Sequence, residues 1–310
     1  MKEKYVAYVG TYTHGSSIGI HLYDVNVEEG TLKERKVVPV NNSSHLARSL
    51  NGKYLYSIAD EGVAVFAIEP DGDLTFINKV DIDGMRGCHL STDEEGKYLF
   101  VAGYHDGKVT VVHTHKDGRL GSVVDGVFHK GLGSVGERNF RPHVSCVRPT
   151  PDNKYLCAVD NGIDQMKVYR INSRTKRLEL VDILRCTRES GPKLIKFSPD
   201  GRFAYLNFEL NNTIEVYRYD GTGKSPVFEK IQTISPPWLP RMIRSTMPHR
   251  ECAFLLTDII FSAPQQGKIQ WPCIREMRRP VFWRPSLSFL SAEIIRKTWM
   301  YSRMENIWLW

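Results

Sequence analysis

The sequence predicts an all-β protein built as a β-propeller, and two repeated motifs carry this prediction. The first is a tight polar turn followed by an apolar run rich in β-forming residues. Its aromatic anchors lie 44, 57 and 48 residues apart, at Tyr54, Tyr98, Tyr155 and Phe203. The second is a strand of alternating apolar and polar residues, which buries one face of a sheet. Repeats of three or four strands with a period in the forties are typical of propeller blades.

The copies follow one another along the chain. The turn-and-strand motif occupies residues 50–56, 94–100, 151–157 and 199–205. The alternating strand occupies residues 19–23, 62–66, 108–112, 165–169 and 213–217. Most alternating strands then turn through Gly or Asp into a third strand, as in Glu69-Pro-Asp-Gly-Asp-Leu. We count about five recognisable blades between Tyr5 and about Thr233.

The pattern stops at Pro236, and the tail after it has a different composition. All six tryptophans lie in residues 236–310, with only one of the 24 glycines. This tail carries 11 Lys and Arg against 5 Asp and Glu, so it holds +6 of the formal +7 and leaves the rest of the chain at +1. The basic balance therefore does not indicate a nucleic-acid or membrane partner for the repeated part.

The tail has two interpretations. A divergent helical domain is one, but the tail lacks a helical hydrophobic period and contains eight prolines. We favour a propeller gene read in a shifted frame after about residue 236, which leaves the C-terminal blades lost or garbled. In a single shifted frame, synonymous codons permit propeller-like turns and strands for residues 246–259, 267–281 and 289–308. We therefore expect propeller blades in residues 1–235 and a non-matching tail without a predicted fold in residues 236–310.

The chain shows no pattern typical of secretion, membrane insertion or metal binding. Residues 1–20 carry no charged-plus-apolar leader, and no apolar run approaches the ~18 residues of a membrane span. The six cysteines have neither a Cys-x-x-Cys pair nor zinc-ligand spacing, which favours buried thiols in a cytoplasmic protein. We expect no cofactor, no metal, no membrane partner, and a monomer or weak oligomer.

Polar side chains gather near the ends of the predicted inner strands, where a propeller opens its central channel. The candidates come from successive repeats, and they are Arg86, His89, Arg141, His143, Lys193, Asn207 and Glu209. Any one of them alone is more often a hydrogen-bonded structural group. Their recurrence at equivalent repeat positions favours a site that several blades build together.

Three segments resemble one known family. They are Tyr8-Val-Gly-Thr-Tyr-Thr, Arg141-Pro-His143 followed by Pro149-Thr-Pro-Asp, and Gly191-Pro-Lys193 with Asn207-Phe-Glu209. Together they resemble the lactonase family of seven-bladed propellers, which contains bacterial 6-phosphogluconolactonase and fungal carboxymuconate cyclase. The likeness covers about residues 5–233 and implies a propeller of the seven-bladed lactonase type.

The resemblance also implies roles for the candidates. His143 and Glu209 match the family's proposed active-site histidine and glutamate. Separately, we expect the other five candidates to contact the substrate. Lys193 stands where an arginine is usual, so it keeps the positive charge but cannot make the bidentate hydrogen bonds of a guanidinium to a carboxylate or phosphate. The family's activity implies that the partner is a small anionic sugar lactone.

The expected reaction is the hydrolysis of 6-phosphogluconolactone to 6-phosphogluconate. It needs water activated by a general base, a stabilised oxyanion and cations that hold the substrate. Either His143 or Glu209 fits the base. A muconate-type cycloisomerase would use the same groups, and a non-catalytic propeller scaffold would use none of them. Because five blades and an unrelated tail cannot pair the first and last strands of a ring, we expect the chain as written to be impaired.

Overall fold

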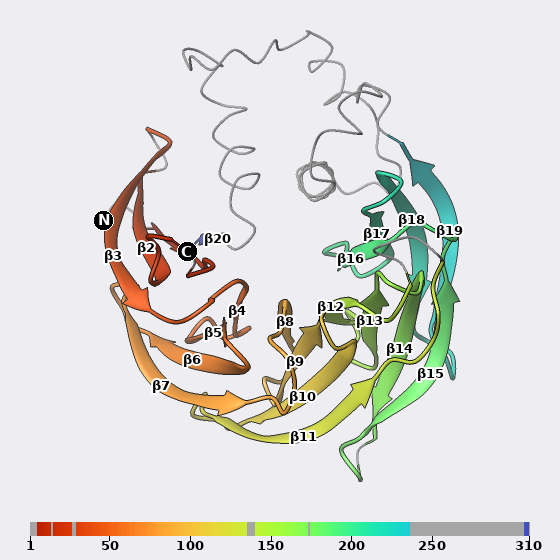
Figure 1. Cartoon of the computed structure of the whole chain (residues 1–310), viewed down its shortest axis with the longest axis horizontal. Coiled ribbons are helices and arrows are strands. Elements are labelled where there is room, and N and C mark those ends of the chain that lie inside the picture. The colour runs from red at the N-terminus through yellow and green to blue at the C-terminus, as the bar shows by residue number, and fades with distance from the viewer. Residues whose placement is uncertain are drawn as a thin grey trace, which may run out of the picture.

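The computed structural model describes residues 5–13, 15–26, 29–134, 140–172, 174–235 and 307–309, and strands are the only regular elements in these ranges. The strands form five four-stranded sheets. The sheets follow one another in chain order around an arc, with the first strand of the second to fifth sheets on its inner side (Figure 1). The predicted all-β propeller architecture is confirmed, with five blades described.

The second to fifth sheets are antiparallel meanders of four consecutive strands, and the first sheet contains three consecutive strands in the same arrangement. The first sheet contains β1 (Tyr5–Val9), β2 (Gly19–Asn26) and β3 (Thr31–Pro39). The second contains β4 (Leu46–Arg48), β5 (Tyr54–Ala59), β6 (Gly62–Ile68) and β7 (Leu74–Asp81). The third contains β8 (His89–Thr92), β9 (Tyr98–Gly103), β10 (Lys108–Thr114) and β11 (Leu120–Phe128). The fourth contains β12 (Val144–Pro149), β13 (Leu156–Asp160), β14 (Gln165–Ile171) and β15 (Leu178–Arg185). The fifth contains β16 (Pro192–Phe197), β17 (Phe203–Phe208), β18 (Thr213–Asp220) and β19 (Val227–Ile234).

The polar turns that define the first motif connect the first two strands of the second to fifth sheets. Each turn has one residue in the left-handed region, with φ of 73°, 64°, 55° and 70° at Gly52, Gly96, Asn153 and Gly201. Glycine and asparagine tolerate this conformation better than other residues. The recurring Gly or Asn in the motif therefore has a backbone cause, and the aromatic anchors that follow it lie at or next to the start of the second strand.

The hydrophobic core lies between neighbouring sheets. In β9, Leu99 and Val101 pack toward the second sheet, whereas Phe100 and Ala102 pack toward the fourth. Successive side chains of a strand point to opposite faces, so a central strand with both faces covered reads as a continuous apolar run. No sheet can bury both of its faces alone, and the stack holds together through these shared layers.

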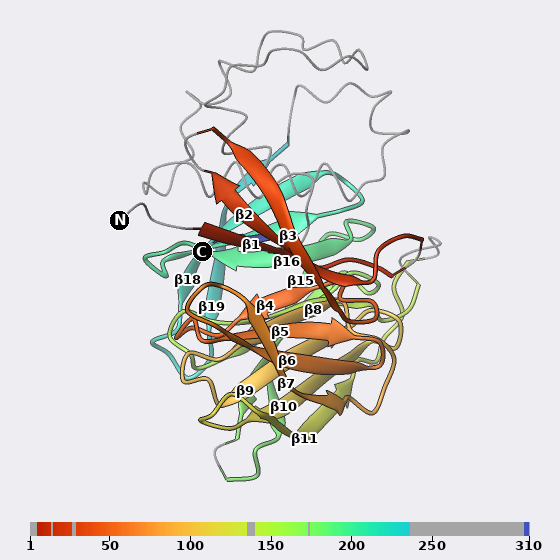
Figure 2. The same ribbon diagram turned by 90° about the vertical axis from the view of Figure 1, so that its left-hand side faces the viewer.

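The first sheet receives its fourth strand from the other end of the chain. Strand β20 (Ile307–Leu309) pairs antiparallel with β1, where Ala7 lies opposite Leu309 and Val9 opposite Ile307. It takes the inner place that β4, β8, β12 and β16 take in the other sheets, and Figure 2 shows the C-terminal end beside β1. The sequence did not predict this strand, because residues 236–310 lack the repeat. The pairing gives the edge of β1 a hydrogen-bonding partner, so the expectation that the tail could not pair with the first strand is wrong.

The part of the chain that the structure describes contains no helix with the length and hydrophobicity needed to cross a membrane.

Candidate functional site

Four side chains from three neighbouring sheets meet near the inner ends of the strands. Tyr104 follows β9 in the third sheet, and His143 directly precedes β12 in the fourth. Lys193 lies in β16 of the fifth sheet, and Glu209 follows β17. Because the sheets are stacked face to face, connections at the same end of adjacent sheets come together. The structure thus joins the two predicted catalytic residues through Tyr104 and Lys193.

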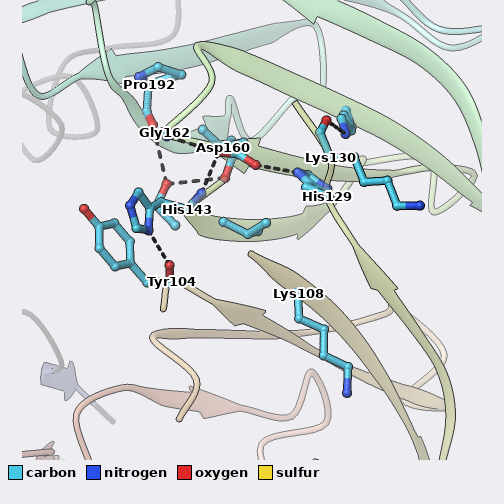
Figure 3. A network of polar contacts seen from close by, with 12 residues as sticks. Tyr104, Lys108, His129, Lys130, His143, Asp160, Gly162 and Pro192 are labelled. Atoms are coloured by element: carbon cyan, nitrogen blue, oxygen red, sulfur yellow. Dashed lines mark hydrogen bonds and ion pairs between the residues drawn. The ribbon is translucent and has the colours of Figure 1, made fainter. Parts of the chain in front are cut away.

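The His143 ring has a fixed orientation and a fixed tautomer. Its Nδ1 lies 2.6 Å from the backbone oxygen of Tyr104, and the two rings stack with centroids 4.5 Å apart (Figure 3). A carbonyl oxygen only accepts hydrogen bonds, so Nδ1 must carry the proton. The neutral ring then has its lone pair on Nε2. His143 is buried, with 6% of its surface exposed, and Nε2 has the electronic state that a general base requires.

Lys193 and Glu209 form the charged half of the site. The Lys193 Nζ lies 3.0 Å from Glu209 Oε2 and 5.4 Å from the centroid of the Tyr104 ring. The Glu209 side chain is 5% exposed and that of Lys193 is 26% exposed, so the ammonium is the part of the pair that solvent reaches. Contacts therefore run from His143 through Tyr104 to Lys193 and Glu209.

Side-chain oxygens of Asn207 and Asp164 accept hydrogen bonds from the backbone on both sides of Lys193. The pairing of β16 with β17 is irregular between Pro192 and Leu194, and there the Asn207 side-chain oxygen accepts the Leu194 N–H at 2.7 Å. Just before β16, Asp164 Oδ1 accepts the Gly191 N–H at 2.9 Å. The structure thus places Asn207, a predicted substrate contact, opposite Leu194, the residue after Lys193, with its side-chain oxygen engaged by the protein backbone.

The predicted arginines lie around His105, which shares the β9–β10 turn with Tyr104. Burial lowers the pKa of His105, and Arg86, His143 and Arg141 lower it further, whereas the neighbouring Asp106 carboxylate opposes them. Arg86 lies over the Tyr12 ring at 5.0 Å, and Arg141, which is exposed, lies over Phe140 at 5.7 Å. This part of the site is suited to an anion, because positive groups from more than one blade converge on it.

His89 lies apart from this group. It is 4% exposed, its ring centroid lies 4.4 Å from that of His45, and its Nε2 lies 3.7 Å from Cys146 Sγ. Burial lowers the pKa of His89 well below its usual range. A neutral, enclosed imidazole of this kind packs between blades, and this one contacts His45 and Cys146 instead of His143 or Glu209.

Sequence reasoning did not select Tyr104 and His105, which lie in the turn between the second and third strands of their sheet, or Asp160, which ends the second strand of the fourth sheet just before the equivalent turn. Glu209 occupies the same kind of turn in the fifth sheet. Comparing this turn across all repeats would have found them. No group of three or more His, Cys, Asp or Glu side chains within the described ranges is arranged to hold a metal ion.

Comparisons with known proteins agree with this architecture. Residues 6–242 match the family model described as "Lactonase, 7-bladed beta-propeller". The chain is 36% identical over 238 residues to a 6-phosphogluconolactonase of Bacillus subtilis, a match that covers 75% of this chain and 67% of the relative.

Two solved structures are similar in both fold and sequence. A putative 6-phosphogluconolactonase from Bacteroides fragilis superposes with a TM-score of 0.69 at 34% identity, covering 76% of this chain and 68% of that protein. A periplasmic gluconolactonase of Pseudomonas aeruginosa gives a TM-score of 0.70 at 30% identity, covering 75% of this chain and 68% of that protein. The chain belongs to the lactonase family of seven-bladed β-propellers.

Proposed function

We propose that this site hydrolyses an anionic sugar lactone, and that the substrate is 6-phosphogluconolactone, which is converted to 6-phosphogluconate. The observation that carries the proposal is the contact between His143 Nδ1 and the Tyr104 carbonyl, 2.6 Å long, which leaves Nε2 as a base. The names of the relatives from Bacillus subtilis and Bacteroides fragilis support the choice of substrate.

In this mechanism His143 Nε2 removes a proton from a water molecule as the water oxygen bonds to the lactone carbonyl carbon. The carbonyl oxygen becomes an oxyanion, which the Lys193 ammonium stabilises. When the tetrahedral intermediate collapses, the bond from that carbon to the ring oxygen breaks. The imidazolium returns its proton to the ring oxygen, which becomes a hydroxyl group, and the product carries a carboxylic acid that ionises in water.

Glu209 supports this chemistry without being the base. Its carboxylate is buried and lies 3.0 Å from the Lys193 Nζ, so its charge serves to hold the ammonium in place. Arg86 and Arg141 supply the positive surroundings for the substrate's phosphate, and the neutral His105 ring near them can donate or accept a hydrogen bond. This assignment separates the two residues that the sequence left as equal candidates for the base.

The test is lactone hydrolysis by purified wild-type protein, His143→Ala and Glu209→Ala, with muconolactone as the competing substrate. Loss of a general base should lower kcat by roughly 10²–10⁴-fold. Preferential turnover of muconolactone would favour a cycloisomerase. Unchanged activity in both variants would overturn the catalytic assignment and favour a scaffold.

We also propose that the 310-residue chain works below the level of a complete seven-bladed relative, because the family match ends at residue 242 and the composition changes at Pro236. A chimera tests this proposal. Residues 236–310 are replaced by the corresponding part of the Bacillus subtilis relative, and kcat/KM is compared with that of the original chain. Equal values would contradict the proposed impairment.

We propose further that the enzyme is cytoplasmic and a monomer or weak oligomer. The four cysteines in the described ranges, Cys88, Cys146, Cys157 and Cys186, are thiols that form no disulfide with one another, which suits a reducing compartment. Cell fractionation and size-exclusion chromatography check the two statements separately.

A further inference from the structure

The buried carboxylate of Asp160 stands directly behind His143. Asp160 is the last residue of β13, and its side chain and that of His129 are both 0% exposed. One carboxylate oxygen, Oδ1, accepts the His143 N–H at 2.8 Å and the Gly162 N–H at 3.0 Å. The other oxygen, Oδ2, lies 2.6 Å from His129 Nδ1 (Figure 3). A carboxylate is costly to bury, so three hydrogen bonds from two blades indicate a specific task.

We propose that Asp160 is a positioning residue for His143, and that His129 holds the Asp160 carboxylate in the rotamer that does this. The inference deepens the proposed function, on which its kinetic part rests. The backbone N–H of His143 donates to Asp160, and its ring Nδ1–H donates to the Tyr104 carbonyl. Together they fix where Nε2 points.

The local strand pairing explains why a side chain is needed at this place. Asp160 pairs with Val144, the first residue of β12, and the ladder is irregular between Val144 and Cys146. The regular ladder therefore begins after His143, whose N–H accordingly bonds to a side-chain oxygen instead of a strand partner. The Asn161 N–H donates to the His143 backbone oxygen at 2.9 Å, so both the N–H and the C=O of His143 are bonded to the segment at the end of β13.

Gly162 makes the arrangement tight. A Cβ at this position would lie 1.7 Å from the Arg141 oxygen and 2.8 Å from His143 Cδ2. The backbone that Asp160 holds through the Gly162 N–H thus packs directly against the His143 ring. A change in the Asp160 rotamer would therefore release the His143 and Gly162 backbones together, and the His143 ring would lose its position.

His129 connects this group to the third sheet. It directly follows β11, and its backbone N–H donates to the Gly107 oxygen at 2.8 Å. Burial lowers the pKa of His129 against the opposing effect of Asp160, so the ring is a neutral donor through Nδ1–H. A donor from the neighbouring blade restricts the carboxylate to one orientation.

The experiment uses the full chain with Asp160→Leu, Asp160→Asn, His129→Leu and His129→Asn. Leucine removes the polar atoms at similar volume. Asparagine at position 129 places an amide N–H near the former Nδ1, and at position 160 it keeps one oxygen acceptor. Displacement of a catalytic base lowers kcat on the order of 10- to 100-fold. We expect the leucine variants to lose kcat by about that factor with little change in KM, and the asparagine variants to recover most of it.

Asp93 provides a matched control. Its Oδ1 accepts the Lys97 and Tyr98 N–H groups, both at 2.8 Å, in the β8–β9 turn outside the site. Asp93→Leu removes the same kind of double backbone acceptor, and it should lower thermal stability while leaving kcat unchanged. Equal losses of kcat in the Asp93 and Asp160 variants would overturn the proposal, because they would point to a general structural effect.

A spectroscopic measurement separates this proposal from the proposed function. The ¹⁵N shifts of the His143 ring in histidine-labelled protein, assigned by their loss in His143→Ala, report which nitrogen carries the proton. We expect a single Nδ1–H tautomer in the wild type at a pH where the ring is neutral, and a tautomer mixture in Asp160→Leu. Unchanged shifts in a folded Asp160→Leu protein would overturn the positioning role. If the shifts change while the wild type fails to hydrolyse lactones, only the proposed function fails.

Discussion

Lys193 and Glu209 form an ion pair within the fifth sheet, with 3.0 Å between Nζ and Oε2. Glu209 is enclosed while Lys193 keeps contact with solvent, as their exposed side-chain fractions of 5% and 26% show. Breaking a fully buried pair by removing one partner costs about 3–5 kcal/mol, because the remaining charge loses compensation. Solvent at Lys193 screens part of this effect. The pair therefore connects the charge of the site with the stability of the blade that carries it.

A double-mutant cycle should detect this coupling. Lys193→Met keeps the aliphatic stem and removes the charge, and it is expected to lower the free energy of unfolding by about 1–2 kcal/mol. Glu209→Gln should also destabilise the protein, but the double variant should lose less than the sum of the two. Urea unfolding of the four proteins gives the coupling energy. Strictly additive losses would show that the pair does not act as a unit.

Gly162→Ala should reduce activity more than stability alone explains. The new Cβ would meet the Arg141 oxygen at 1.7 Å and His143 Cδ2 at 2.8 Å, so the ring must move. Displacement of a catalytic base lowers kcat by on the order of 10²-fold. The measurement is the steady-state rate of lactone hydrolysis, together with the thermal midpoint.

Gly96→Ala is the control for this prediction. Gly96 has a φ of +64°, and no atom lies within 4 Å of the position that a Cβ would take, so alanine adds backbone strain without a clash. Strain of this kind costs about 1–2 kcal/mol. Gly96→Ala should therefore lower the thermal midpoint and leave kcat unchanged. A Gly162→Ala protein with wild-type kcat would contradict the steric argument.

The sequence predicted the blades because each repeat carries its own signal. The turn residues Gly52 and Asn153 follow from local backbone geometry. The alternation in β18 predicted one buried face, but residues 214–217 are all buried, so both faces of the strand are covered there. The site depends on pairs that no local pattern contains. The contact of His143 with the Tyr104 carbonyl spans 39 positions, and that of His129 with Asp160 spans 31. A backbone oxygen has no residue type to recognise, so the partner that fixes the His143 tautomer could not be read from the sequence.

Two buried histidines should make the fold sensitive to acid. Burial lowers the pKa of His45 from 6.5 to about 3, and it lowers the pKa of His89 as well. Below about pH 6.5 these two histidines bind protons in the unfolded chain but stay neutral in the folded chain, until the pH reaches their lowered pKa values. Stability is therefore fully present above about pH 6.5 and falls as the pH decreases, by up to about 1.4 kcal/mol per pH unit for each histidine.

Urea unfolding at pH 7 and pH 5.5 measures this slope. His89→Gln replaces one titrating ring with a neutral amide, and the decrease in stability between the two pH values should become smaller. His115, which is exposed, is the matched control, and His115→Gln should leave the slope unchanged. If His89→Gln keeps the full wild-type slope, other groups cause the acid sensitivity.

The tail yields a prediction at the level of the gene. If residues 236–310 come from a shifted reading frame, the nucleotide sequence should contain a one-base insertion or deletion near codons 234–238. Restoring the frame should then produce the repeat motifs that residues 246–259, 267–281 and 289–308 permit. The restored protein would have further blades of its own to place beside the fifth sheet, and it should show higher kcat/KM and solubility than the 310-residue chain. An intact frame would contradict this prediction, and the tryptophan-rich tail, whose β20 pairs with β1, would then be a genuine part of this protein.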